Sequence, residues 1–581
     1  MPSLNPLLWL LAIALPFALP LSTPPNPQDF SVYAFSQSDV MWDDDPQVYA
    51  LLPDVTIRAI GKWSTNGTKA SDYNFAQIAR YHNHNITFMG SGTASVIFPH
   101  DFPTLEIYDD MSTYDAEGNP VPHDEFGFPV PARRGNLFNP SYRNYLLSWA
   151  KLQIDGGVDG INFDEVNGGY SGGQKWGFNG NEGFDDYTLA DFNRYLLAKY
   201  PDFTIADWQG RFAMTPENIL SETFPPDDLL NNFNYRSYLQ HHNWSHNPLA
   251  STNPLSAEWG KVTSNRVYPD TSFLPTYIRF YWTSLTTTLR DHSLSQRNRT
   301  LLISSNGIWP GVSFNSVGLY PWNPDEVTPD FRGADYVPVL TTTSPNGTIS
   351  THLNGSKSLK SQFRYLKSLH RNITSSPTNP SDDNETPIAI FIDWPNDMMT
   401  NYQSLPANEK NDYWRIFGAE AYANGLFPAF HLKDTVGGMT AKEAGILEFL
   451  VGYAGFFRRN GGFFTRNVPV DMVLGEVKEE VGFGGEGKER LVGSVLVQMG
   501  SGRQTVHIVN HDYEMGVMRA AEGVVVEVGI GVVGGCPKAV EVVSPDFAVG
   551  EVRAGKATCE GGKVKVEIGR VIYYSVLVFR M

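Results

Sequence analysis

The chain has 581 residues and a formal net charge of -18 at pH 7, with 41% apolar, 18% charged and 13% aromatic residues. This length exceeds one ordinary domain, so two folded units with sizeable cores are expected. The negative charge argues against nucleic acid and anionic membrane surfaces as partners, because both would repel this protein.

The first 22 residues contain an apolar run from Leu7 to Leu15, broken afterwards by Pro16 and Pro20. The run is short for a bilayer span and has the position of a secretory signal peptide, although the usual basic residue before it is missing. We therefore predict that 1–22 is a signal peptide. The protein is expected to be secreted and extracellular, with no membrane partner after the peptide is removed.

Asn-x-Ser/Thr sequons occur eight times, which agrees with passage through a eukaryotic secretory pathway. We predict N-linked glycans at several of Asn66, Asn85, Asn243, Asn298, Asn346, Asn354, Asn372 and Asn384.

Between residues 28 and 466, short extended runs alternate with helical patterns, which is typical of a parallel βα architecture. The runs predict eight strands, at 31–35, 55–60, 86–89, 160–164, 301–305, 335–340, 388–393 and 426–432. Helices are predicted between them, among others at 142–153, 189–199, 277–292, 359–370 and 413–424. The predicted fold class is α/β, a (β/α)8 TIM-type barrel. Long insertions at 98–138 and 170–277 are expected to build its substrate face, part of the second as a helical subdomain.

Residues 467–581 are valine-rich, punctuated by glycine and alternate in polarity, which predicts a C-terminal all-β sandwich domain. This domain contains both cysteines of the chain, Cys536 and Cys559. In an oxidising compartment they can pair, and two buried thiols are the alternative.

The strand at 160–164 reads Gly-Ile-Asn-Phe-Asp and ends in acidic residues and a glycine-rich loop. Alternation assigns Ile161 and Phe163 to the face packed by helices, and Asn162 and Asp164 to the interior of the barrel. Asp164 then lies at the carboxyl end of a strand, where barrel enzymes have their active sites. A structural acid paired with a buried arginine is the alternative for this residue.

The run at 387–392 repeats this design, because Asp393, Trp394 and Asp397 follow it. Hydrolysis of a glycosidic bond needs one protonated acid and one carboxylate, and two acids at the same end of a barrel supply that pair. The catalytic candidates are Asp164, Asp393 and Glu165. Alternation turns Glu165 away unless the strand has already ended, and Asp393 has the alternative role of capping its loop.

Side chains suited to binding sugar hydroxyls and sugar faces follow other strands. The predicted substrate-binding residues are Arg58, Asn162, Asn306, Trp309, Trp394, Asp397 and His431. No metal or cofactor is predicted, because the acidic triplet 43–45 lacks the spacing of a known calcium loop. Ser171 matches a Gly-x-Ser-x-Gly pattern, but it lies in a loop several residues past the strand rather than at a tight strand-to-helix turn.

The pattern Gly-Val-Asp-Gly-Ile-Asn-Phe-Asp at 157–164 resembles the fourth strand of retaining barrel glycosidases, including the family 66 dextranases. The resemblance implies that Asp164 is the nucleophile. In those enzymes the acid/base is a glutamate on the next strand, whereas this chain has Ser304, Ser305 and Asn306 there. Asp393, Glu165 and Glu326 remain as acid/base candidates.

The same stretch is also similar to the motif strand of family 18 chitinases, through Asp159, Asn162 and Asp164. Val166 stands where that motif has its glutamate, so the chitinase resemblance fails at its key residue.

The sequence thus predicts a secreted retaining glycoside hydrolase that acts on a neutral poly- or oligosaccharide. One alternative is a catalytically inactive carbohydrate-binding protein on the same scaffold, and another is a structural wall-associated glycoprotein. The C-terminal domain is predicted to be a structural cap on the barrel, or else a carbohydrate-binding surface.

Overall fold

A computed structural model of the chain describes 18 segments. These are residues 30–36, 45–58, 73–93, 96–123, 130–164, 183–215, 233–248, 250–263, 277–309, 312–317, 389–392, 407–425, 427–432, 440–465, 467–470, 481–498, 501–514 and 517–581. The predicted signal peptide at 1–22 lies outside them.

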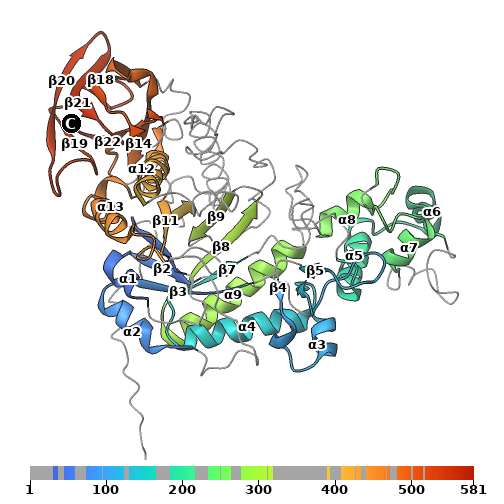
Figure 1. Ribbon diagram of the computed structural model, residues 1–581. Coiled ribbons are helices and arrows are strands. Elements are labelled where there is room, and N and C mark those ends of the chain that lie inside the picture. The colour runs from blue at the N-terminus through green and yellow to red at the C-terminus, as the bar shows by residue number, and fades with distance from the viewer. Residues whose placement is uncertain are drawn as a thin grey trace, which may run out of the picture.

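Eight strands form a closed barrel at the centre of the molecule (Figure 1). Around the barrel they are ordered β1, β11, β10, β9, β8, β7, β3 and β2. Their bounds are β1 Tyr33–Ser36, β2 Val55–Arg58, β3 Thr87–Thr93, β7 Gly160–Asp164, β8 Leu302–Trp309, β9 Val312–Val317, β10 Ala389–Ile392 and β11 Phe427–His431. A barrel was expected from the sequence, and seven of its strands lie where they were predicted.

The remaining strand of the barrel, β9, was not predicted. Strand β9 runs antiparallel to both of its neighbours, β8 and β10, while every other pair in the barrel is parallel. The strand predicted at 335–340 lies outside the described residues. The described strands therefore form a barrel that departs from regular (β/α)8 alternation at this point.

Helices cover the outside of the barrel. They are α1 Pro46–Leu51, α2 Ala76–Asn83, α4 Pro140–Asp155, α9 Tyr277–Arg297, α12 Ala407–Ala423 and α13 Leu447–Arg459. The start of α4 shows how the sequence sets a boundary: the Asn139 side chain accepts a hydrogen bond from the Ser141 backbone N–H (2.8 Å), and Pro140 occupies the first turn. None of the described helices is long and apolar enough to cross a membrane.

Two groups of elements interrupt the barrel pattern. Between β3 and α4 lie a small sheet of β4 Val96–Ile97, β5 Pro122–His123 and β6 Ala132–Arg134, the 3-10 turn Pro99–Asp101 and helix α3 Leu105–Asp110. Between β7 and α9 lie α5 Asp186–Lys199, α6 Ile205–Phe212, α7 Tyr235–His241 and α8 Ser256–Thr263. Figure 1 shows α5 to α8 gathered at one end of the molecule, on the side of the barrel opposite the C-terminal sheets.

The C-terminal residues form an antiparallel sheet of nine strands, ordered β12, β14, β15, β22, β19, β20, β21, β18 and β13. Their bounds are β12 Asn467–Pro469, β13 Gly482–Glu486, β14 Leu491–Gln498, β15 Gln504–Asn510, β18 Ala521–Gly529, β19 Ala539–Val543, β20 Arg553–Glu560, β21 Lys563–Val571 and β22 Tyr574–Arg580, and a separate hairpin pairs β16 Tyr513–Glu514 with β17 Val517–Met518. Strand β20 joins two halves of the sheet, and valines from both halves share one core. The C-terminal domain is therefore sheet-rich, and the more specific expectation of a β-sandwich stays a prediction.

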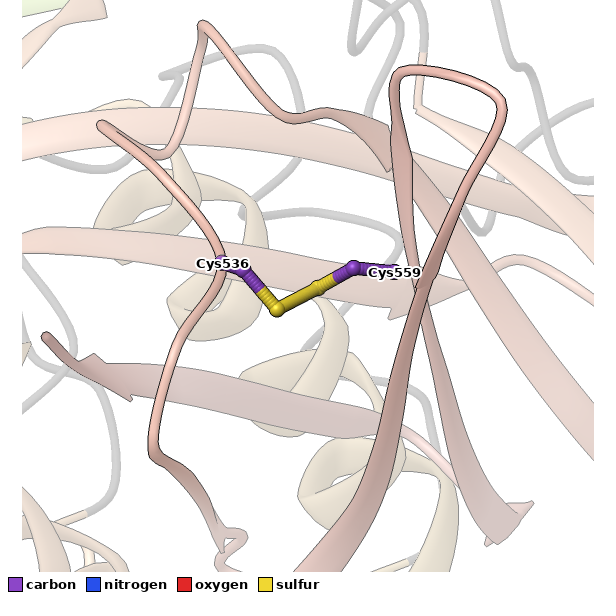
Figure 2. Close-up of a disulfide and its surroundings, with 2 residues drawn as sticks. All are labelled: Cys536 and Cys559. Atoms are coloured by element: carbon purple, nitrogen blue, oxygen red, sulfur yellow. A yellow bond between two sulfur atoms is a disulfide. The ribbon is translucent and has the colours of Figure 1, made fainter.

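The two cysteines of this domain are paired. Cys536 lies before β19, Cys559 lies in β20, and their Cα atoms are 6.0 Å apart (Figure 2). The sequence left pairing and two free thiols open, and the structure has the disulfide, which ties the segment between β18 and β19 to the sheet.

Three of the eight sequon asparagines lie in the described residues, and all three are exposed. Asn85, Asn243 and Asn298 follow helices α2, α7 and α9 and have φ angles of 58°, 56° and 51°. Asparagine tolerates this left-handed conformation at helix ends better than most residues, so each has a backbone role independent of modification. N-glycosylation at these sites, and at the five sequons outside the described residues, stays a prediction.

Candidate functional site

Strand β7 is positioned by a tight turn after α4. Gly157 has a φ of +114°, a conformation that L side chains rarely adopt, so glycine is required there. Gly160 opens the strand between β3 and β8, and a Cβ on it would lie 2.7 Å from the Leu302 carbonyl oxygen. The glycines that precede Asp164 therefore have structural roles. Gly157 forms the turn before β7, and Gly160 lets β7 pack closely between β3 and β8.

The two faces of β7 are distinguished by their contacts. The Phe163 ring packs on Trp149 of α4 with 6.1 Å between ring centroids, so Phe163 faces the helices, as alternation predicts. Gly92 of β3 pairs with Phe163, and a Cβ on Gly92 would lie 2.7 Å from the same Trp149 ring. Asn162, which is fully buried, and position 164 belong to the opposite face of the strand, which lines the barrel lumen.

Strand register extends this lumen face around the barrel. Asn162 pairs with Ser91 and Ser304, and position 164 pairs with Thr93. On this face of β7, β8 and β11, polar positions follow apolar ones from the amino end. Asn162 and Asp164 follow Gly160 in β7, Ser304 and Asn306 follow Leu302 in β8 before Ile308, and His431 follows Phe427 and Ala429 in β11.

By strand register, the positions of Asn162, Asp164, Asn306 and His431 share one face of the barrel wall. The positions of Arg58 and Trp309 alternate to the other face, which in β3 carries Phe88, whose ring stacks on Tyr81 of α2. Glu165, Asp393, Trp394 and Asp397 lie outside the described residues, as do Glu326 and Ser171. The catalytic and substrate-binding assignments of all these residues stay predictions.

The sequence analysis did not foresee a charged cluster at the amino end of β7. Asp159, whose side chain is fully buried, forms an ion pair with Arg299, lies 2.8 Å from His82 Nε2, and accepts a hydrogen bond from the Phe88 backbone N–H (2.8 Å). This cluster is at the opposite end of β7 from Asp164. Asp159 is thus a structural anchor that joins α2, β3, β7 and the start of β8, and it takes no part in a site at the carboxyl ends.

A second cluster that the sequence analysis missed fixes the helical insertion to the barrel. Asp191 of α5 accepts a hydrogen bond from the Tyr281 hydroxyl of α9, and the Arg143 guanidinium of α4 stacks on the Tyr281 ring at 3.9 Å. Burial raises the pKa of Asp191, while Tyr281 and Arg194 act in the opposite direction. Because α4 and α9 each precede a barrel strand, their first turns lie where the strands end, so α5 is anchored on the side of the candidate site.

Asp185 is the buried carboxyl group whose pKa would suit a general acid. Burial raises its pKa to about 6, against the lowering effect of its hydrogen bonds. Its oxygens accept hydrogen bonds from the Thr188 backbone N–H (2.9 Å) and the Thr188 hydroxyl (2.8 Å) at the start of α5. These bonds make Asp185 the N-cap of α5, which explains its burial without a catalytic role.

Among the residues that the structure describes, no three His, Cys, Asp or Glu side chains are grouped so that they could hold a metal ion. Asp45 of the acidic triplet accepts a hydrogen bond from the Gln47 backbone N–H (2.9 Å) and so caps α1.

No protein-family model matches this chain, and no curated protein matches it. Similar solved structures include a cycloisomaltooligosaccharide glucanotransferase of Paenibacillus sp. complexed with cycloisomaltoheptaose (9% identity, TM-score 0.44, covering 95% of this chain and 85% of that one). They also include the α-L-fucosidase isoenzyme 2 of Paenibacillus thiaminolyticus (9%, 0.44, 94% and 99%) and an α-amylase from H. orenii (11%, 0.42, 95% and 100%). The solved structures that this chain resembles, at low sequence identity, are thus glycoside hydrolases and a glucanotransferase.

Proposed function

We propose that the protein is a secreted glycoside hydrolase whose active site lies at the carboxyl ends of the barrel strands. The observation that supports this most is the lumen face of β7, β8 and β11, on which polar positions follow apolar ones, with Asp164 at the end of β7. Active sites of parallel barrels are built at this end, and glycosidic hydrolysis needs a carboxylate there.

In the proposed mechanism the Asp164 carboxylate attacks the anomeric carbon while a second carboxylic acid protonates the leaving glycosidic oxygen. Water, deprotonated by that second group, then releases the sugar from Asp164 with retained configuration. Asp393, Glu165 and Glu326 are the candidates for the second group. The amides of Asn162 and Asn306 and the imidazole of His431 are proposed to bind sugar hydroxyls.

The proposed substrate is a neutral poly- or oligosaccharide. The formal charge of -18 disfavours approach of an acidic polymer, because like charges repel over the whole surface at low ionic strength.

A panel of neutral glycans tests the activity: release of small sugars from at least one of them is expected, and ¹H NMR of the first product should show the anomer of the substrate. The rival proposal is a carbohydrate-binding protein without activity. Asp164→Asn separates the two, because an enzyme would lose hydrolysis and keep glycan binding, whereas a binding protein has no hydrolysis to lose. A structural wall glycoprotein would release no sugar from any glycan.

A further inference from the structure

Strand β9, which was not predicted from the sequence, adds polar positions to the barrel wall. It lies beside β8 (Figure 1) and is antiparallel to both β8 and β10. Its register is fixed from both sides, because Asn315 pairs with Asn306 of β8 and with Phe391 of β10. Residues paired directly across two strands share a face of the sheet. Since Asn306 is on the lumen face, the position of Asn315 is on that face as well.

The same register brings the two asparagines close to the end of β7. Asn162 pairs with Ser304, so the next lumen position of each strand places Asp164 level with Asn306. Neighbouring strands are about 4.8 Å apart, so the backbone of Asn315, two strands from β7, is about 10 Å from that of Asp164 along the wall. Two amide-bearing positions therefore adjoin the carboxylate that is proposed to attack the sugar.

The mouth of the barrel, at the carboxyl ends of its parallel strands, does not by itself explain this polar pair. Strand β8 runs toward the mouth and β9 runs away from it, so chain direction cannot account for asparagines at one level. The lumen face of the two strands consists of the pairs Ser304–Val317, Asn306–Asn315 and Ile308–Ser313. Of these pairs, only the middle one is polar on both strands. Exposure at the mouth would favour polar residues there, but Ile308 is nearer the mouth than Asn306, and none of these positions is charged.

Paired polar residues also occur without a site. On the other face of the same strands, Ser305 pairs with Ser316. Directly opposite residues have Cβ atoms about 4.5–5.5 Å apart, so two asparagines at such positions can bond to each other and merely stabilise the wall. An amide side chain has two N–H donors and an oxygen that accepts twice, so one mutual bond leaves most of these groups to a ligand. The two roles therefore differ in what substitution of Asn315 changes, which is stability in one case and substrate affinity in the other.

We propose that Asn315 is a further substrate-binding residue, which together with Asn306 binds two neighbouring hydroxyl groups of one sugar ring beside Asp164. This inference rests on the proposed glycosidase function and narrows its substrate to a neutral glycan whose ring at this point has adjacent free hydroxyls. A hydroxyl group donates and accepts, as an amide does, so each asparagine matches one hydroxyl. The lumen positions of β8 and β9 include no lysine or arginine that would pair with an acidic sugar.

The test compares kcat and KM of the full-length parent, Asn315→Ala and Ser316→Ala on the glycan that the panel identifies. Ser316 is the matched control, because it is the next residue of β9 and its position is on the other face. Asn315→Ala should lower kcat/KM by at least about tenfold, and Ser316→Ala should change it by less than about twofold. Thermal unfolding is measured alongside, since a purely structural amide pair predicts a lower unfolding temperature for Asn315→Ala with an unchanged KM.

Calorimetric titration with Asp164→Asn in all variants makes the same comparison without turnover, and there Asn315→Ala should raise Kd by at least about tenfold. If Asn315→Ala fails to fold, Asn315→Thr replaces it, because threonine suits a strand and its hydroxyl has a shorter reach than the amide.

The outcomes separate this inference from the function on which it rests. If the parent hydrolyses or binds a glycan and the variants at 315 and 316 behave alike, the inference is overturned and the proposed carbohydrate site stands. If the parent neither hydrolyses nor binds any glycan of the panel, both are overturned. A loss confined to the variant at 315, with an unchanged unfolding temperature, supports the inference.

Discussion

Asp159 shows how a single buried carboxylate organises the strand that carries Asp164. Its partners come from three elements: His82 at the end of α2, the Phe88 backbone in β3 and Arg299 just before β8. Since the side chains of Arg299 and His82 are only 11% and 9% exposed, water cannot replace the carboxylate as their partner.

Asp159→Asn should lower the free energy of unfolding by about 3 kcal/mol, because it leaves the Arg299 charge buried without a counterion. Urea unfolding followed by circular dichroism measures this. The control is Glu522→Gln, which removes the exposed partner of Arg570 and should leave the urea midpoint unchanged. Equal effects of the two substitutions would show that Asp159 is no anchor.

At the scale of elements, the Trp149 ring of α4 packs directly on the β3 backbone at Gly92, which has no side chain of its own. The Trp149 ring lies so close that an added Cβ would be 2.7 and 2.9 Å from two of its carbons. The ring is itself packed against Phe163 of β7, so it has little room to move.

Gly92→Ala is therefore expected to lower stability by about 1–3 kcal/mol through overpacking. It should also lower any glycan hydrolysis, because β3 and β7 would have to shift beside Asn162 and Asp164. Gly210→Ala is the matched control, and it should raise the thermal unfolding temperature slightly. An alanine at 92 that is as stable as the parent would contradict the close packing of α4 on β3.

The disulfide stabilises the part of the C-terminal domain that contains β19. Cys536 and Cys559 are separated by 23 residues, and their link closes a loop that contains β19. A closed loop of this length contributes about 3 kcal/mol by restricting the unfolded chain. The Cys536→Ser, Cys559→Ser double variant should lose that much in urea unfolding under oxidising conditions, and under reducing conditions it should match the parent. Equal stability of the two proteins without reductant would contradict this.

At the scale of the whole molecule, the contact between the barrel and the C-terminal domain contains polar as well as apolar side chains. One of these polar side chains, His507, makes the free energy of unfolding depend on pH. His507 of β15 is fully buried between Thr505 and Tyr574, and its ring meets Phe464 with 5.9 Å between ring centroids. Burial lowers the pKa of His507 to about 3. In the unfolded chain a histidine has a pKa of about 6.5, so the unfolded state takes up this proton first as the pH falls.

Stability should therefore be unaffected by His507 above about pH 6.5 and should decrease by about 1.4 kcal/mol for each pH unit below it. Urea unfolding at pH 7.5, 6.0 and 5.0 measures the slope, to which protonation of other groups also contributes. His507→Gln, which keeps hydrogen-bonding groups between Thr505 and Tyr574, should reduce the slope by that amount. An unchanged slope in the variant would mean that His507 is not held neutral.

The sequence predicted where the strands lie better than it predicted their direction and their pairing. Seven barrel strands could be located from apolar runs that end in polar residues, because a strand buried on both faces consists mainly of apolar residues. The antiparallel strand β9 was missed, although Pro310-Gly311 between two extended runs is a hairpin signal.

The faces of Arg58 and Trp309 were beyond prediction for a different reason. They depend on which residues pair across neighbouring strands, and a shift of one residue reverses every assignment. The partners of Asp159 were unpredictable for the same reason, since they come from positions 77 and 140 residues away in the chain.

The central claim is that Asp164 at the end of β7 carries the chemistry of a glycosidase. The most direct measurement is kcat/KM of the parent, Asp164→Asn and Asp155→Asn on the glycan that the panel identifies. Asp155 ends α4 with an exposed ion pair to His292, and its substitution should leave the rate unchanged. Asp164→Asn should lower kcat/KM by at least about 10³-fold while the protein remains folded and binds the glycan. A folded Asp164→Asn variant that hydrolyses the glycan at the parent rate would contradict the claim.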